Sequence, residues 1–153
     1  MNLRRIVYDF LISERDKPAN TAIFDTEIQA DRYEEVKNGG GAGQNVWIRL
    51  DNIKRYETRI QLGQIKQINA PVEIQIIVRP VTQNEIDRRE AEERVTRIAL
   101  ELVMLFDQYE KLNDTSNSIC NTATLGGLEE WIKIANVRHA TGYVVLVINP
   151  VKT

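Results

Sequence analysis

The feature that most constrains the fold is a long helical periodicity that begins after Asn84 and runs to about residue 112. Asn84 is a suitable N-cap, and Asp87 stands at the third helical position, where a carboxylate can complete a capping box. At 1.5 Å per residue, the stretch predicts a helix roughly 40 Å long. Its first half is almost wholly charged, whereas the half around Glu101 is apolar. Spacings of three and four place one set of apolar residues on a core-facing stripe: Val95, Ile98, Ala99, Leu102, Leu105, Phe106 and Tyr109.

The apolar half of this helix carries more apolar residues than one face can hold. Leu100, Val103 and Met104 lie off the core stripe. A helix that packs on a sheet needs only one apolar stripe, so we expect a second cover on its other side. That cover is either the N-terminal helix or a neighbouring subunit. The three residues are therefore candidates for a subunit interface.

The other elements are a short helix and a series of strands. Residues Asn2–Glu14 repeat apolar side chains at spacings of three and four, which predicts a helix. Residues 20–36 fit strands about as well as they fit a loop packed on the core. Alternation or β-rich composition predicts strands at 46–50, 56–62, 72–78, 131–137 and 143–148.

The last two predicted strands are expected to form a hairpin through a loop at residues 138–142. The final strand, 143–148, is apolar on both faces. A central strand covered on both sides has this pattern, and so does a strand that meets another chain. Val145 and Val147 are accordingly further interface candidates.

The order of these elements predicts an α+β fold, with a mainly antiparallel sheet packed by one long helix and a short N-terminal helix. Residues 1–153 are expected to form a single domain, because this length can bury a core and the composition is 42% hydrophobic and 27% charged. A net charge of −2 argues against a polycation that grips nucleic acid. The lone cysteine, Cys120, excludes an internal disulfide and a cysteine-based zinc cage. The sequence holds no apolar run long enough to span a membrane, and Asp9 argues against a secretory signal.

A glycine-rich segment at residues 38–45 raises the question of phosphate binding. It holds four of the eight glycines: Gly39, Gly40, Gly41 and Gly43. A Walker-type loop needs Gly-Lys-Ser/Thr and an immediate helix, and a dinucleotide fingerprint needs a strand before the glycines and a helix after them. Gln44-Asn45 and a strand follow here instead. The segment is better interpreted as a flexible loop between two strands.

The sequence contains no catalytic signature, and it predicts no catalytic residue, no cofactor and no metal site. His139 is the only histidine and falls in the expected hairpin loop, where an exposed turn residue is the simplest interpretation. Nothing places it near Cys120, so a catalytic dyad is a weak alternative. The clustered carboxylates Glu90, Glu92 and Glu93 are better explained as a solvated helix face than as an acid–base pair.

The chain resembles the tail terminator and tail-completion proteins of tailed bacteriophages. The resemblance lies in a short N-terminal helix, an alternating strand after a proline (Ala70-Pro71-Val72-Glu73-Ile74-Gln75-Ile76), a long charged-then-apolar helix and a closing hairpin. It covers most of the chain, but it is one of element order and size and involves no diagnostic motif. In that family, the subunit forms a hexameric ring on the last ring of the tail tube, stops tube growth and presents a surface to the neck. The family has no catalytic residues.

The resemblance implies a non-enzymatic virion protein, made in the host cytoplasm and placed at the tail–neck junction. Its partners would be its own copies, the tail tube protein, a neck or connector protein, the sheath of a contractile tail, and DNA that passes through the ring non-specifically, but no membrane. Docking on the tube or neck is assigned to the loop candidates Gly39, Gly40, Gly41, Gly43, Arg138 and His139. One alternative is a head-closure or other neck connector protein. The other, of a different class, is a small α+β enzyme or ligand-binding domain with Tyr33, Arg49, His139 or Glu129 around a pocket.

Overall fold

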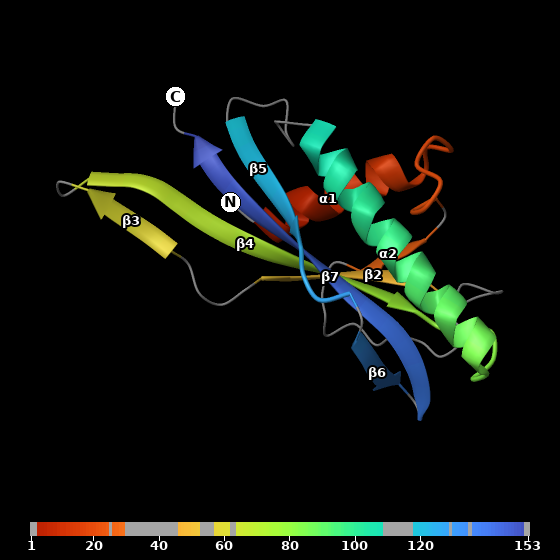
Figure 1. Cartoon of the computed structure of the whole chain (residues 1–153). Coiled ribbons are helices and arrows are strands. Elements are labelled where there is room, and N and C mark those ends of the chain that lie inside the picture. Colours follow the sequence, from red (N-terminus) through yellow and green to blue (C-terminus); the bar gives the residue numbers. More distant parts are fainter. Residues whose placement is uncertain are drawn as a thin grey trace.

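A computed structural model describes residues 3–24, 26–29, 46–52, 57–61, 64–108, 118–128, 130–134 and 136–151. In chain order the elements are α1 (Leu3–Arg15), β1 (Glu27–Gln29), β2 (Val46–Asn52), β3 (Glu57–Gln61), β4 (Gln64–Val78), α2 (Glu85–Gln108), β5 (Ser118–Leu125), β6 (Glu130–Ile134) and β7 (Val137–Val151). Both helices lie on the same side of the sheet (Figure 1). The fold is therefore α+β, as the sequence predicts.

The sheet is built around the strand order β1-β2-β4-β7-β5, with β3 paired to β4 and β6 paired to β7. Only the pairing of β1 with β2 is parallel among the described strands, and the other pairings are antiparallel. The expected helices at the N-terminus and after Asn84 are both present. The glycine-rich segment at 38–45, and the part of the long helix expected beyond Gln108, lie outside the described residues.

The start of α2 confirms Asn84 as the N-cap and corrects the role of Asp87. The side-chain oxygen Oδ1 of Asn84 accepts a hydrogen bond from the backbone N–H of Asp87 at 2.8 Å. The expected reciprocal bond from Asp87 to the Asn84 backbone is replaced by a relay through Thr82. The Thr82 hydroxyl donates to Asp87 Oδ2 at 2.5 Å and accepts from the Asn84 N–H at 3.2 Å. Aspartate is shorter than the glutamate of a standard capping box, and the hydroxyl spans the difference.

Strand β4 is eight residues longer at its N-terminal end than the expected strand at 72–78, because it begins at Gln64. The alternation in the sequence placed the start of this strand after Pro71. A proline cannot donate to a β-ladder, which normally keeps it out of central strands. On one side, β4 pairs with β3 up to Asn69 and with β2 from Val72, so the Ala70-Pro71 step falls between these two partners, while on the other side Pro71 pairs with Val147 of β7.

The strands after α2 differ from the sequence analysis in two respects. Ser118 begins strand β5, which the sequence did not predict. The β6–β7 hairpin does not turn at residues 138–142, because Ile134 already pairs with Val137. The turn contains Asn136, whose φ of 65° lies in the left-handed region that asparagine tolerates better than most residues.

Gly142 has a different role from the one expected of a loop glycine. It lies within β7, and a Cβ added there would come within 2.6 Å of Val95 Cγ1 on α2. The missing side chain thus allows α2 to approach the sheet closely. Glycine at this position reflects helix–sheet packing and not a turn.

The main core lies between the helices and the sheet. Its sheet side consists of alternate residues of three adjacent strands, and its helix side is the buried stripe of α2: Ala91, Val95, Ile98, Ala99, Leu102, Leu105 and Phe106. Phe10 of α1 meets Phe106 of α2 with ring centroids 5.2 Å apart, so the helices touch along their shared edge. A smaller cluster of Trp47 and Ile77 lies on the opposite face of the sheet. Ile77, which breaks the alternation of the strand, belongs to that second cluster.

Candidate functional site

The outer face of α2, the side turned away from the sheet, carries two exposed large apolar residues. Leu100 and Met104 lie there one helical turn apart and are 46% and 63% exposed. The neighbouring core residue Leu102 is completely buried, so one side of the apolar half of α2 faces solvent and the other side faces the core. Two exposed apolar residues at adjacent positions on one face are typical of a contact surface.

The N-terminal helix does not provide the second cover that the sequence requires. Helix α1 packs on β1, β2 and β4, beside α2 rather than over it (Figure 1). Leu100 and Met104 stay exposed in its presence. Of the two covers proposed from the sequence, α1 is therefore excluded for these two residues.

A short turn after α1 is attached to the flank of α2. The Glu101 carboxylate accepts hydrogen bonds from the backbone N–H groups of Ala22, at 3.2 Å, and Ile23, at 2.9 Å. Ile23 is fully buried, while the adjacent Phe24 is 47% exposed. Glu101, the isolated charge of the apolar half of the helix, thus satisfies two backbone donors. Local sequence patterns could not reveal this role, because the two segments are far apart along the chain.

The other interface candidates occupy different environments. Val103 is half-buried and packs against the main core. Val145 is half-buried in β7, and Val147 pairs with Pro71 of β4 and Thr122 of β5. The assignment of all five residues to a subunit interface stays a prediction; Leu100 and Met104 are exposed.

The loop candidates Arg138 and His139 are not in a loop. Both lie in β7, where they pair with Lys133 and Ile132 of β6. Arg138 is exposed, and its guanidinium lies 5.7 Å from the ring centroid of Trp131. The remaining loop candidates, Gly39, Gly40, Gly41 and Gly43, are outside the described residues.

His139 is completely buried, contrary to its expected exposure in a turn. It lies on the sheet face opposite the helices, with its ring centroid 6.0 Å from that of Trp47. Nδ1 donates to the Val137 carbonyl oxygen at 2.9 Å, while Nε2 is buried without a hydrogen-bond partner. Burial lowers the pKa of His139 below its usual value, the bond to Val137 partly opposes this, and the charge of Arg79 lowers it further. Burial therefore favours the neutral form of His139.

A polar network occupies the same sheet face. The Gln75 amide donates to the Thr141 hydroxyl at 3.3 Å and to the Tyr143 hydroxyl at 3.2 Å, and Thr141 in turn donates to the Ile76 carbonyl at 2.9 Å. Burial, followed by the charges of Glu130 and Glu73, raises the pKa of Tyr143. These contacts satisfy buried polar atoms within the sheet. They do not place an acid and a base around a common open space.

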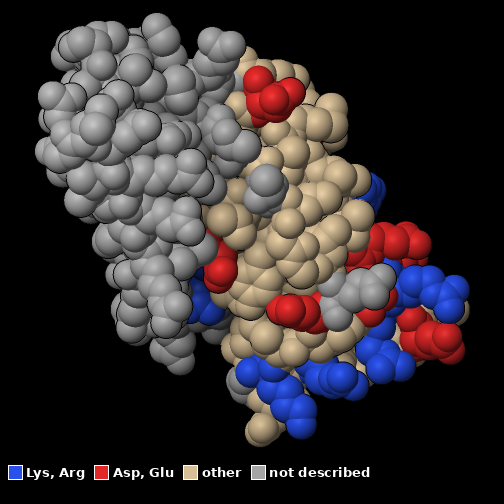
Figure 2. All heavy atoms as spheres, turned by 60° about the vertical axis from the view of Figure 1, so that its left-hand side comes forward, with Lys and Arg blue, Asp and Glu red and all other residues tan. Residues whose placement is uncertain are grey.

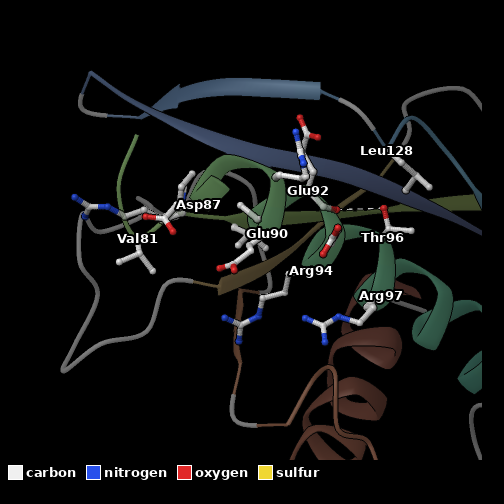
Figure 3. A pocket seen from close by; sticks show the side chains of 14 residues that line it. Val81, Asp87, Glu90, Glu92, Arg94, Thr96, Arg97 and Leu128 are labelled. Carbon is white, nitrogen blue, oxygen red and sulfur yellow. Dashed lines mark hydrogen bonds between the residues drawn. The ribbon is translucent and has the colours of Figure 1, made fainter. Parts of the chain in front are cut away.

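A groove of about 860 Å³ runs beside the charged half of α2. Figure 3 shows Arg94 and Arg97 on one side of the helix, and Glu92, Thr96 and Leu128 on the other. Burial and the neighbouring Arg97 lower the pKa of Arg94. In Figure 2, charged side chains of both signs gather at one end of the described surface, beside a broad uncharged area.

The enzyme alternative placed Tyr33, Arg49, His139 or Glu129 around a pocket. Tyr33 and Glu129 are outside the described residues, and neither Arg49 nor His139 lines the groove. Within the described ranges, His, Cys, Asp and Glu side chains form no group of three suited to holding a metal ion. No described helix is both long enough and apolar enough to cross a membrane.

No protein-family model and no curated protein matches the chain.

Proposed function

We propose that the protein is a structural, ring-forming subunit of a bacteriophage tail, the terminator that caps the tail tube and joins it to the neck. The proposal combines the resemblance in element order with one structural observation. Leu100 and Met104 form an exposed apolar face on a helix whose opposite side fills the core. A non-catalytic assembly role accounts for that face, because copies of the subunit can cover it.

The energetics favour association through this face. Full burial of a leucine or methionine side chain contributes roughly 1.5–3 kcal/mol, and about half of each side chain remains to be covered here. Covering the rest of each side chain would thus contribute on the order of 1 kcal/mol to association. The same contribution would recur at every interface of a ring. Because each contribution is small, it suits subunits that assemble on a template better than subunits that form a permanent oligomer in dilute solution.

A ring requires a head-to-tail contact, in which two different surfaces of the subunit meet. The outer face of α2 would supply one surface. Strand β5 would supply the other, because it ends the strand order of the sheet and Leu125 is 44% exposed there. The glycine-rich segment at 38–45 would dock on the tube.

The proposal is tested by adding purified protein to isolated tail tubes and measuring tube elongation and ring formation by electron microscopy. We expect rings of about six subunits at tube ends and arrested growth. The double variant Leu100→Ser/Met104→Ser should lose ring formation. Val81→Ser is the matched control, because Val81 is 81% exposed but lies before α2 and outside this face. Wild-type protein that neither binds tubes nor arrests their growth would contradict the proposal.

A further inference from the structure

Four exposed residues follow one another along the outer face of α2 at spacings of three, four and three: Arg97, Leu100, Met104 and Asp107. We call them the outer stripe. At 100° per residue, they fall on one side of the helix, directly opposite the buried stripe centred on Leu102. The 3-4-3 spacing is that of successive a and d positions in a coiled coil, the pattern by which one helix packs on another.

The two ends of the outer stripe carry opposite charges, Arg97 at one end and Asp107 at the other. Among the described ion pairs, none involves Arg97 or Asp107. Nearby charges are satisfied differently: Arg89 bonds Glu85, and Glu101 bonds backbone amides. Arg97 also lies close enough to Arg94 to lower the pKa of that residue. Exposed Glu93 lies one turn before Arg97 on the same face, and an anionic group of a partner would add to its attraction for Arg97.

The outer stripe is complementary to itself when a second copy runs in the opposite direction. A two-fold axis midway between Leu100 and Met104 brings Leu100 of each helix against Met104 of the other. The same axis brings Arg97 of each helix against Asp107 of the other. A parallel arrangement would instead oppose arginine with arginine and aspartate with aspartate. The charges therefore select the antiparallel pair as well as stabilising it.

We propose that a second copy of this chain covers the outer stripe in an antiparallel, two-fold α2–α2 pair. This contact is isologous and closes after two copies. Subunits capping a tube all point the same way, so the pair belongs to protein that is not on a tube and keeps Leu100 and Met104 covered until a ring forms. Only this last role rests on the proposed function; the pair itself does not.

Charge reversal tests the pair without removing any apolar contact. Sedimentation velocity of the free protein over a range of concentrations should show a monomer–dimer equilibrium. Arg97→Asp and Asp107→Arg should each weaken dimerisation about tenfold or more, since each creates two like-charge contacts per dimer. The double reversal Arg97→Asp/Asp107→Arg should restore it. Lys133→Asp, an equal change of charge at an exposed site on β6, is the matched control.

Orientation is tested by cysteine cross-linking in a Cys120→Ser background. A mixture of Leu100→Cys and Met104→Cys proteins should form a mixed disulfide dimer faster than either protein alone. A strictly monomeric wild type, single reversals without effect, no rescue by the double reversal, or preferred Leu100→Cys self-cross-linking would each overturn the proposal. Because these measurements use free protein, they can fail while tube capping succeeds, and the reverse also holds.

Discussion

The two sides of α2 carry similar apolar residues that lie in different environments. On the inner side, Leu102, Leu105 and Phe106 are at most 4% exposed and fill the space over the sheet. On the outer side, Leu100 and Met104 are equally apolar but remain in water. Composition alone does not distinguish them, because both sets lie within one turn of each other. The buried set stabilises the fold, the proposal assigns the exposed set to association, and variants can separate the two roles.

The largest expected effect lies on the inner side. Leu102→Ala should lower the free energy of unfolding by about 2–5 kcal/mol, because it removes a fully buried side chain and leaves a cavity. Leu100→Ala, the same substitution on the outer side, should lower it by only about 1 kcal/mol, because about half of that side chain is exposed. Urea unfolding of both variants measures the contrast. Equal losses would show that the two sides are not distinct.

The next effect concerns how closely the inner side approaches the sheet. Gly142→Ala places a methyl group 2.6 Å from Val95 Cγ1, so α2 or the Val95 side chain must shift. Overpacking of this kind costs about 1–3 kcal/mol. Adding Val95→Ala should recover part of the loss by making room, which a double-mutant cycle in urea would detect. Additive losses would mean that the clash is not the cause.

Acid should lower the free energy of unfolding through His139, which lies on the opposite face of the sheet from α2. The pKa of buried His139 is lowered, so the unfolded chain takes up its proton at a higher pH than the folded chain. The stabilising contribution is complete above about pH 6.5 and is lost as the pH falls from there toward the lowered folded pKa, by at most about 1.4 kcal/mol per pH unit.

Unfolding measured between pH 6.5 and 5 tests this dependence, since most carboxylates titrate lower. His139→Gln should flatten the pH profile in that window, and sedimentation should show that dimerisation of the folded protein is retained. A profile as steep in the variant as in the wild type would assign the dependence to another group.

A smaller effect on stability is expected at the N-terminus of α2. Asn84→Ala removes the acceptor for the Asp87 N–H and should cost about 1 kcal/mol. Asn84→Asp keeps an acceptor and should cost much less. Thermal unfolding followed by circular dichroism would rank the two variants. An alanine variant as stable as the wild type would show that Thr82 alone sustains the cap.

Local sequence patterns were sufficient to predict the helices, whose hydrogen bonds are local, and a strand that alternates between a polar and an apolar face. The spacing of apolar residues identified α1 and α2, and alternation identified the second half of β4. The excess of apolar residues at Leu100 and Met104 was also visible from spacing alone. These signals need no knowledge of which segments meet in space.

The missed features depend on pairing between distant segments. Strand β5 contains two threonines, a serine and an asparagine among its eight residues and is fixed by its register with β7, in which Ala123 pairs with Leu146. Gly142 resembled a turn residue because Val95, far away in the sequence, could not be placed against it. His139 was assigned to an exposed turn because the sequence placed the hairpin turn at residues 138–142. The turn lies a few residues earlier, so His139 falls within a buried part of β7.

The most direct test of the central claim is the oxidation rate of Met104. The only other methionine is Met1, and Met104 is 63% exposed in the isolated chain, so peroxide should oxidise it rapidly in dilute solution. Mass spectrometry of peptides containing Met104 would follow sulfoxide formation as protein concentration rises, with and without tail tubes. The account predicts that oxidation slows when copies of the subunit associate and cover the outer face. An oxidation rate that is the same at every concentration and on tubes would contradict it.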